Sequence, residues 1–235
     1  MRELADVIAA RKAALSGRPL LVGLTGPVSV GKTTIANELA AALPGLRVSI
    51  VSTDGFLLPN AELDRRSLSM KKGFPESFDT ARLNRFLDEA RAGVTPLRVP
   101  VYDHLAYDVV VGDDATVESG DVIIVEGVNA LLPAHATAYD VTVYVHADDA
   151  AVVEWFCARL AQLFKEAAGD PSSFYAPFAA WPDDQVRQFA QGAWDGINAV
   201  NLEEHIRPAR PRAEFVIEKG PDHAIRAVAR QTPLR

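Results

Sequence analysis

The sequence predicts an α/β fold in which a mostly parallel central sheet is flanked by helices. Residues 20–43 contain, in this order, an apolar run, a glycine-rich loop and a helix-forming stretch. Residues 122–125 are a continuous β-branched run, typical of a strand that is buried on both faces of a parallel sheet. An alternating apolar strand at residues 141–145 precedes a helical pattern over residues 148–165. Strands that alternate with helices are typical of parallel sheets.

The composition predicts one globular domain over residues 1–235. A hydrophobic content of 49% and a charged content of 23% are typical of a folded protein with a sizeable core. The net charge of −7 argues against a nucleic-acid partner, because such partners are bound by dense Lys and Arg surfaces. The single cysteine, Cys157, excludes an internal disulfide. Charges interrupt the N-terminus and no apolar run reaches membrane-spanning length, so we expect a cytoplasmic protein without a membrane partner.

The glycine-rich loop, residues 26–33, reads GPVSVGKT and matches the phosphate-binding pattern G-x-x-x-x-G-K-[ST]. The glycines let several N–H groups and the positive end of the next helix face one point. Lys32 is expected to reach the outer phosphates of a nucleotide, and the Thr33 hydroxyl to bind Mg²⁺. The expected nucleotide-binding residues are Gly26, Ser29, Val30, Gly31, Lys32, Thr33 and Thr34. A chance glycine-rich turn is the alternative, which the strand and the helix on its flanks disfavour.

The strand predicted after this loop and its helix is followed by a first candidate catalytic carboxylate. A short helix over residues 3–15 precedes the first strand, and residues 48–51 predict a second, mostly buried strand. Asp54 follows this strand. The carboxyl ends of strands line the ligand crevice of open α/β sheets, so Asp54 can accept a proton from an attacking hydroxyl. A turn-forming aspartate before glycine is an equally weighted interpretation.

The middle of the chain predicts substrate-covering segments. Residues 70–79 are basic, aromatic and rich in turn formers, so they could cover a substrate or form a solvated loop with two ordinary lysines. A helix is expected over residues 80–92. Residues 96–111 form an extended stretch with prolines suited to an edge, and His104 in it could bind substrate or be structural. Residues 109–118 predict a hairpin-like excursion that turns at Gly112-Asp113-Asp114.

A second carboxylate, Glu126, ends the β-branched run and should face the same crevice as Asp54. An acidic residue at this place holds Mg²⁺ directly or through water in phosphate-loop proteins. The helix over residues 148–165 carries Arg159, which could stabilise charge on a transferring phosphoryl group or lie on the surface.

The last third of the chain predicts a lid or substrate wall over about residues 160–184, whose aromatic residues could equally form a satellite core. A long helical stretch over residues 183–205 carries Asn198, which could hydrogen-bond a substrate. Residues 213–217 predict a last strand, and residues 222–229 a closing helix.

Six blocks of the chain resemble bacterial type I pantothenate kinase, a family grouped with uridine kinase and phosphoribulokinase. The blocks are GPVSVGKT at 26–33, TDGF at 53–56, KKGFPESFD at 71–79, PVYDHLAYD at 100–108, EGVN at 126–129 and W-x-x-I-N-x-x-N-L at 194–202. The resemblance implies a P-loop kinase fold, a homodimer, and transfer of the γ-phosphate of ATP, with Mg²⁺, to pantothenate in the first step toward coenzyme A. It also makes coenzyme A a candidate feedback inhibitor.

The resemblance also implies roles for individual residues. Lys32 and Thr33 would serve the phosphates and Mg²⁺, and Asp54 would be the general base. The positions that would contact the acceptor or the transferred phosphate are Tyr102, His104, Arg159 and Asn198.

Four positions depart from the family pattern. Phe156 replaces a tyrosine that bonds the substrate, Leu160 and Leu163 replace phenylalanines of the acceptor pocket, and Asn37 replaces a basic residue linked to inhibition. A pocket altered in this way can take another acceptor, so a related kinase for a nucleoside or a sugar is the alternative. A nucleotide-binding switch or a catalytically silent binding protein is the alternative from another class.

Overall fold

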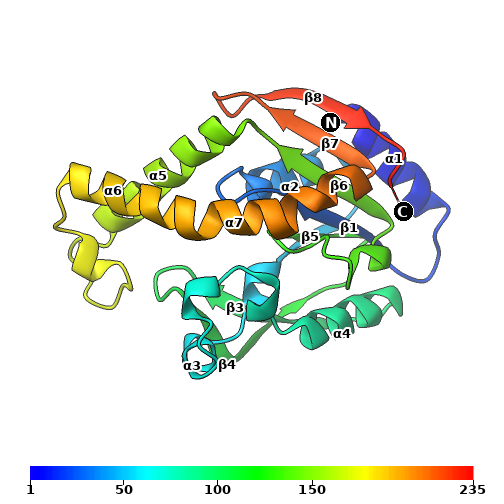
Figure 1. Cartoon of the computed structure of the whole chain (residues 1–235). Coiled ribbons are helices and arrows are strands. Elements are labelled where there is room, and N and C mark those ends of the chain that lie inside the picture. Colours follow the sequence, from blue (N-terminus) through cyan, green and yellow to red (C-terminus); the bar gives the residue numbers. More distant parts are fainter. Residues whose placement is uncertain (235) are drawn as a thin grey trace.

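A computed structural model describes residues 1–234 of the chain (Figure 1). Its main sheet has six strands in the order β2-β5-β1-β6-β7-β8. The first five of these in spatial order run parallel, and β8 is antiparallel to β7. The strands are β1 (Leu20–Thr25), β2 (Val48–Ser52), β5 (Val122–Glu126), β6 (Val141–His146), β7 (Phe215–Lys219) and β8 (Ile225–Arg230). The predicted α/β fold with a mostly parallel sheet is confirmed.

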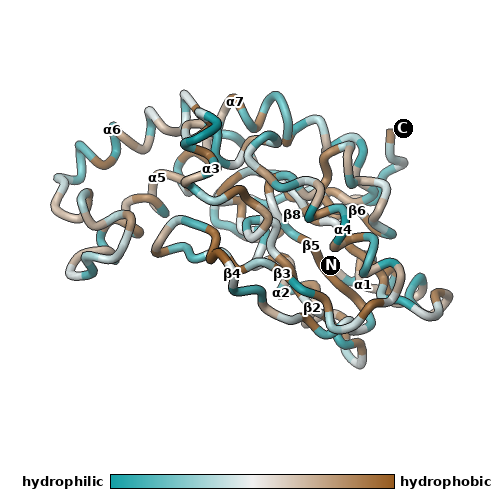
Figure 2. The backbone as a smooth tube through the Cα atoms, turned by 90° about the horizontal axis from the view of Figure 1, so that it is seen from below, coloured by the Kyte–Doolittle hydropathy of each residue, from teal (hydrophilic) through white to brown (hydrophobic). Residues whose placement is uncertain are grey.

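The centre of the sheet is covered on both faces. Every residue of β1 and of β5 is buried, so side chains that point to opposite faces are equally protected from water. Helices that contact the sheet supply the cover: α1 (Arg2–Ala13) and α4 (Thr80–Arg91) pack on β1, and α2 (Lys32–Ala41) packs on β1, β2 and β5. Figure 2 shows the hydrophobic colour along the central strands, whereas α6 alternates between polar and apolar turns. Burial of these aliphatic side chains is the main stabilising contribution to the fold.

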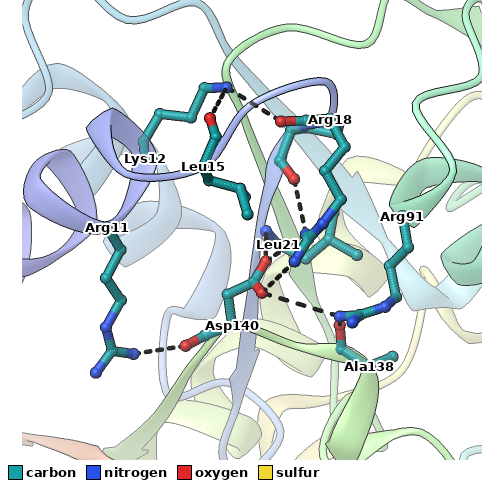
Figure 3. A network of polar contacts seen from close by, with 9 residues as sticks. Arg11, Lys12, Leu15, Arg18, Leu21, Arg91, Ala138 and Asp140 are labelled. Carbon is teal, nitrogen blue, oxygen red and sulfur yellow. Dashed lines mark hydrogen bonds and ion pairs between the residues drawn. The ribbon is translucent and has the colours of Figure 1, made fainter.

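Asp140, directly before β6, joins several elements at the amino end of the sheet (Figure 3). Its carboxylate accepts hydrogen bonds from both terminal nitrogens of Arg18, at 2.8 and 2.7 Å, and from the Leu21 N–H at 2.9 Å. Arg11 of α1 donates to the Asp140 backbone carbonyl. Burial opposes ionisation of the carboxyl, but the bonds from Arg18 and Leu21 outweigh it and hold its pKa below the ordinary value.

Two more strands begin after a paired acidic residue. Asp121 precedes β5 and accepts a hydrogen bond from the Arg47 N–H at 2.9 Å, with the Arg47 side chain 3.4 Å away. Glu214 precedes β7 and pairs with Arg11 at 2.6 Å and with Arg230 at 2.9 Å. Since the strands are parallel, these pairs and that of Asp140 all lie at the amino end of the sheet. We call this set the amino-end ion pairs.

A two-stranded hairpin forms a second, smaller sheet from β3 (Leu97–Asp103) and β4 (Asp108–Val117). The prediction of a turn at Gly112-Asp113-Asp114 is wrong, because the turn lies at residues 104–107 and Gly112 lies within β4. The register shifts between Pro100 and Tyr102, and Gly112 sits opposite this shift with φ of +84°. The glycine therefore serves a bulge, which needs the same conformational freedom as a turn.

The predicted closing helix over residues 222–229 is also wrong. Residues Ile225–Arg230 form β8, which pairs antiparallel with β7 after a tight turn in which the Gly220 N–H bonds the Ala224 carbonyl. An eight-residue helix would gain little stability alone. Pairing with β7 satisfies a row of backbone groups that would otherwise form an open sheet edge.

Helices and aromatic turns build a wall that runs from the left of Figure 1, at α6, to its centre, at α7. They are α5 (Asp149–Glu166), α6 (Asp183–Ala193) and α7 (Ala199–Asn201), with π-helical turns at Trp194–Asn198 and Leu202–Ile206 and a 3₁₀ segment at Arg207–Arg212. The helical stretch predicted over residues 183–205 is confirmed. The expected lid over residues 160–184 overlaps the end of α5 and the start of α6, and the residues 167–182 between them are irregular apart from a 3₁₀ turn at Ala176–Phe178.

The aromatic residues of this wall form a cluster apart from the main core. Phe164 stacks on Phe178 with ring centroids 4.9 Å apart, and Trp181 and Phe189 pack on the same pair. The interpretation as a satellite core is therefore confirmed for Phe164, Phe178 and Trp181, whereas Phe189 is 43% exposed. Among residues 1–234, no helix combines the length and the apolar character that crossing a membrane requires.

Candidate active site

A cavity of about 750 Å³ opens at the carboxyl ends of β1, β2 and β5. The strand-end argument predicts this location, because parallel strands point their carboxyl ends at one edge. The cavity gathers most of the predicted site residues on its wall: Ser29, Gly31, Lys32, Thr33, Thr34, Asp54, Tyr102, His104, Glu126, Phe156, Arg159 and Asn198. Gly26 and Val30 of the loop do not line it, since both are buried.

The glycines of the loop have steric reasons to be glycines. A Cβ on Gly26 would lie 2.4 Å from the Val145 carbonyl oxygen, so no larger residue fits between β1 and β6. Gly31 has φ of +86° and lies directly before α2, where a left-handed backbone suits glycine. The loop therefore delivers the amino end of α2 to the cavity, where its free N–H groups can hold phosphate oxygens.

Lys32 begins α2 and keeps its charge available to an anion. Its ammonium donates to two backbone carbonyls, of Pro27 at 2.9 Å and of Gly26 at 3.3 Å, and neither is charged. Burial lowers the pKa of Lys32, and the nearby carboxylates of Glu126 and Asp54 oppose that shift.

Glu126 and Thr33 supply the oxygen ligands that a divalent cation prefers. The Thr33 hydroxyl donates to a Glu126 carboxylate oxygen at 2.8 Å, and Glu126 is only 5% exposed. Burial raises the pKa of Glu126 against the opposing effect of Lys32, so a cation there would stabilise the ionised form. Within residues 1–234 no group of three or more His, Cys, Asp or Glu side chains can hold a metal. The pair fits Mg²⁺, whose remaining ligands would be phosphate oxygens and water.

Asp54 lies one residue into the 3₁₀ turn Thr53–Phe56 that follows β2. The Ser52 hydroxyl accepts a hydrogen bond from the Asp54 N–H at 3.3 Å. A Cβ on Gly55 would lie 2.1 Å from the Pro100 carbonyl oxygen, so this turn packs tightly on β3. In the described chain no protein group donates to the Asp54 carboxylate, which leaves both oxygens available to a ligand.

The expected acceptor-binding residues come from three elements. Tyr102 of β3 and His104 after it pack edge to face with ring centroids 5.1 Å apart. Asn198 of the first π-helical turn donates to the Ala193 carbonyl at 3.2 Å, and Phe156 of α5 packs on Trp194 at 5.8 Å. Arg159 lies one turn beyond Phe156 on α5. The structure brings these residues to one cavity.

The departures from the family pattern fall in different places. Leu160 and Leu163 line the cavity, next to five aromatic residues of the wall: Phe164, Phe174, Tyr175, Phe178 and Phe189. Asn37 is exposed on α2 and donates to the Thr33 carbonyl at 2.8 Å, outside the lining.

Sequence reasoning missed three polar residues at this end of the sheet. Lys72 and Asn201 line the cavity, and Lys219 at the end of β7 donates to the Val30 carbonyl at 2.8 Å. The strand-end argument could have found Lys219 had it been applied to β7. Asn201 lies three residues after Asn198, so helical spacing already places both on one face. The sequence places Lys72 in a covering or solvated loop and in the family block KKGFPESFD, but assigns it no role of its own.

Comparisons with known proteins indicate the family of the chain. No protein-family model matches the chain. The pantothenate kinase of Sorangium cellulosum is 47% identical over 222 residues, which cover 90% of this chain and 72% of that protein. The pantothenate kinase of Bradyrhizobium sp. ORS 278 is 41% identical over 226 residues, which cover 90% of this chain and 71% of that protein.

Solved structures share the fold at lower identity. The D-glycerate 3-kinase of Cryptococcus neoformans superposes with a TM-score of 0.68 at 15% identity, covering 97% of this chain and 98% of that one. The phosphoribulokinase of Rhodobacter spheroides superposes with a TM-score of 0.53 at 14% identity, covering 87% and 71%. Similarity at this level shows the fold alone. The identity to the curated relatives runs through nearly the whole chain, and the protein therefore belongs to the pantothenate kinase family.

Proposed function

We propose that this protein transfers the γ-phosphate of ATP to a hydroxyl of pantothenate, the first step toward coenzyme A. It is an ATP-dependent small-molecule kinase, and the names of its relatives supply the acceptor. The observation that carries the proposal is the shared cavity. Asp54, Lys32 and the amino end of α2 all line it. Phosphoryl transfer requires the donor phosphate and the acceptor hydroxyl in one such space.

The donor half of the reaction uses the loop and its helix. The N–H groups at the start of α2 and the Lys32 ammonium hold the phosphates of ATP. Arg159, which is exposed on α5 at the cavity, adds a second positive charge for the phosphoryl group in transfer. Mg²⁺, held by Thr33 and Glu126, would neutralise phosphate charge when bound.

The acceptor half depends on Asp54. Its carboxylate accepts the proton of the acceptor hydroxyl as that oxygen forms a bond to the γ-phosphorus, while the bond from the γ-phosphorus to the bridging oxygen of ADP breaks. Tyr102, His104 and Asn198 contact the acceptor, and Phe156 contributes an apolar surface beside them. The aromatic wall excludes water, which would otherwise compete with the acceptor for the phosphoryl group.

The direct test is turnover. The protein is mixed with Mg-ATP and pantothenate, and the release of ADP and the formation of a phosphorylated acceptor are followed. We expect acceptor-dependent ADP release well above the rate without acceptor. Equal rates with and without pantothenate would refute the proposed acceptor.

A second acceptor class is favoured by one observation, the presence of Leu160 and Leu163 in the cavity wall. A panel of nucleosides and sugars, tested beside pantothenate at equal concentration, distinguishes the two kinase functions. Tight ATP binding with no acceptor stimulation by any compound would instead favour a nucleotide-dependent switch.

Assembly, location and regulation follow from the family as further parts of the proposal. The protein would act in the cytoplasm as a homodimer with Mg²⁺, and coenzyme A would inhibit it. Light scattering coupled to gel filtration tests the dimer. Titration of coenzyme A into the turnover assay tests inhibition. Asn37, at the position that the family pattern links to inhibition, lies outside the cavity lining.

A further inference from the structure

Two buried asparagine side chains meet at the Gly73 carbonyl. Asn129 donates to this oxygen at 2.8 Å and Asn201 at 2.9 Å. Their side chains belong to residues that are 2% and 6% exposed, and the proposed mechanism uses neither. Asn129 follows β5 and Asn201 ends α7, so one carbonyl joins two elements that are far apart in the chain. We call Asn129 and Asn201 the amide pair.

The amide pair leaves two polar atoms without a partner. A carbonyl oxygen only accepts hydrogen bonds, so each amide must turn its nitrogen to Gly73 and its oxygen away. In the part of the chain that the structure describes, both amide oxygens are buried and neither has a hydrogen-bond partner. A buried oxygen without a partner costs stability. The fold therefore gains little from the amide pair, which favours a functional reason for it.

Gly73 belongs to the covering segment, residues 69–78, which lies between α3 (Asn60–Arg65) and α4. Four residues of the covering segment line the cavity: Ser69, Met70, Lys72 and Gly73. The Ser77 hydroxyl accepts a hydrogen bond from the Gly73 N–H at 2.9 Å and donates to the Phe74 carbonyl at 2.7 Å. Residues 73–77 are therefore bonded to one another, and a group that holds the Gly73 carbonyl positions all of them.

The stretch 126–129, which leads from β5 to the first amide, is fixed on two sides. The Thr25 hydroxyl of β1 donates to the Val128 carbonyl at 2.8 Å. A Cβ on Gly127 would overlap the Thr53 hydroxyl, so the backbone of this stretch packs directly on the 3₁₀ turn that follows β2. The Asn129 side chain therefore starts from a backbone that contacts two neighbouring strand ends.

Those strand ends carry the two candidate carboxylates of the site. Glu126 begins the stretch that contains Asn129, and Asp54 lies in the turn on which this stretch packs. The bond from Asn129 to the Gly73 carbonyl thus ties the covering segment to both of them. Phosphoryl transfer requires the acceptor hydroxyl in one geometry between its base and the phosphate, and a fixed wall keeps that geometry.

We propose that Asn129 and Asn201 are positioning residues, which hold the covering segment at a fixed place relative to Asp54 and Glu126. The inference rests on the proposed kinase function. Because both amides donate to one oxygen, each is a partial substitute for the other. Removal of one leaves the Gly73 carbonyl with a donor, whereas removal of both takes away both bonds that hold it.

The test compares Asn129→Ala, Asn201→Ala and the double variant with wild type in the pantothenate assay. We expect kcat/KM for pantothenate to fall less than about threefold in each single variant and about tenfold or more in the double variant. The KM for ATP should stay within about twofold, because the nucleotide loop is unchanged.

Asn84→Ala is the matched control. Asn84 lies on α4 outside the cavity lining, and its side chain bonds His135 at 3.1 Å. The variant therefore also loses an asparagine hydrogen bond, but it leaves the covering segment in place. Its kcat/KM should stay within about twofold of wild type.

A second readout separates positioning from a general loss of stability. A displaced wall admits water, whose oxygen bonds the γ-phosphorus in place of the acceptor oxygen, so that ADP and phosphate are released. The double variant should therefore release more ADP than it forms phosphorylated pantothenate, whereas wild type forms equal amounts. Amide hydrogen exchange should be faster in the double variant across residues 69–78 and unchanged across residues 26–33.

Asn201→Asp tests the same contact even if the double variant does not fold, because it keeps the size of the side chain and leaves Asn129 in place. Its carboxylate faces the Gly73 carbonyl, and two oxygens that only accept hydrogen bonds repel each other. The value of kcat/KM should therefore fall further in Asn201→Asp than in Asn201→Ala. Equal values would show that Asn201 does not act through Gly73.

A folded double variant that keeps wild-type kcat/KM would overturn the proposal, as would a loss no larger than the product of the two single losses. Failure of the proposed acceptor has a different signature, namely absent turnover of pantothenate by wild type. The hydrogen-exchange comparison needs no acceptor, so it still decides whether the amide pair holds the covering segment.

Discussion

The two ends of the parallel sheet treat charge in opposite ways. At the amino end, Asp121, Asp140 and Glu214 each stand directly before a strand, and each is paired with arginine. At the carboxyl end, none of the charged side chains that line the cavity makes an ion pair within 4 Å in the part of the chain that the structure describes. Ion pairs at the amino end of the sheet therefore hold the strands in place, whereas the charges at the carboxyl end stay available to ligands.

This difference has an energetic reason. A partly buried charge that is paired and hydrogen-bonded stabilises the folded arrangement of the chain. Removal of its partner destabilises the fold, because it leaves a partly buried charge without compensation. Unpaired charges held close together cost stability, and that cost is reduced when phosphate, Mg²⁺ or substrate binds. Substitutions at the carboxyl end should therefore change turnover and leave folding largely intact, whereas those at the amino end should do the reverse.

The largest effect is expected for Asp54→Asn. The amide cannot accept the proton of the acceptor hydroxyl, so kcat should fall by about 10² to 10⁴, the usual contribution of a general base. ATP binding, measured by titration calorimetry, should stay within about twofold, because the loop and Lys32 are unchanged. The melting temperature should not fall, since no protein group donates to the Asp54 carboxylate. Wild-type turnover in this variant would remove Asp54 from the mechanism.

The next effect in size is expected for Asp140→Asn at the other end. The change leaves Arg18, whose side chain is 16% exposed, without its carboxylate partner. Because the pair is partly exposed, we expect a loss of about 2 kcal/mol in the free energy of unfolding, below the range for fully buried pairs. Calorimetry should show the melting temperature falling by about 4–8 °C. Below the transition kcat should match wild type; an equal loss of kcat would show that the two ends are coupled.

The pH dependence of stability should sharpen the same contrast. The folded-state pKa of Asp140 is depressed by Arg18 and the Leu21 N–H, which outweigh burial, so the unfolded chain binds the proton more readily. Its stabilisation is complete above the unfolded pKa of about 3.9 and is lost as pH falls through the lower folded value. Urea unfolding between about pH 5 and pH 2.5 should show a shallower loss in Asp140→Asn than in wild type. Identical slopes would contradict this assignment.

The smallest effect is expected for Arg47→Ala, at the exposed edge of the amino-end ion pairs. The Arg47 side chain is 77% exposed and 3.4 Å from Asp121. Its N–H donates to the same carboxylate and is retained in the variant. The free energy of unfolding should therefore change by less than about 0.5 kcal/mol, as for exposed pairs generally. A change in the free energy of unfolding as large as that of Asp140→Asn would show that side-chain exposure does not determine how much each pair contributes to stability.

The sequence predicts the carboxyl-end site better than any other part. The loop at residues 26–33 has a local motif, and Asp54 and Glu126 each end an apolar strand, so fold logic alone brings them together. The chemistry of these positions depends on residue type and strand order, and both can be read along the chain. Their roles stay predictions until turnover is measured.

Tertiary contacts account for what sequence reasoning missed. Lys72 is held by Asn60 and by the Tyr107 carbonyl, which lie 12 and 35 residues away along the chain. No local pattern distinguishes it from exposed Lys71. Residues Ile225–Arg230 became a strand because β7 offered an unpaired edge, and Gly112 became a bulge because β3 and β4 shift register. The amino-end ion pairs were missed for the same reason, since their partners come from distant segments.

The two π-helical turns that flank α7 let this helical segment hold extra residues without a change in the direction of the side chains that follow. Each wide turn takes up one residue more than an α-helical turn would, and Asn201 between them reaches the Gly73 carbonyl. Removal of one residue from Trp194–Asn198 would convert this wide turn to an α-helical turn and leave the residues after it, Asn201 included, in place. A single deletion here would therefore keep the bond from Asn201 to the Gly73 carbonyl, whereas substitution of Asn201 by alanine would remove it.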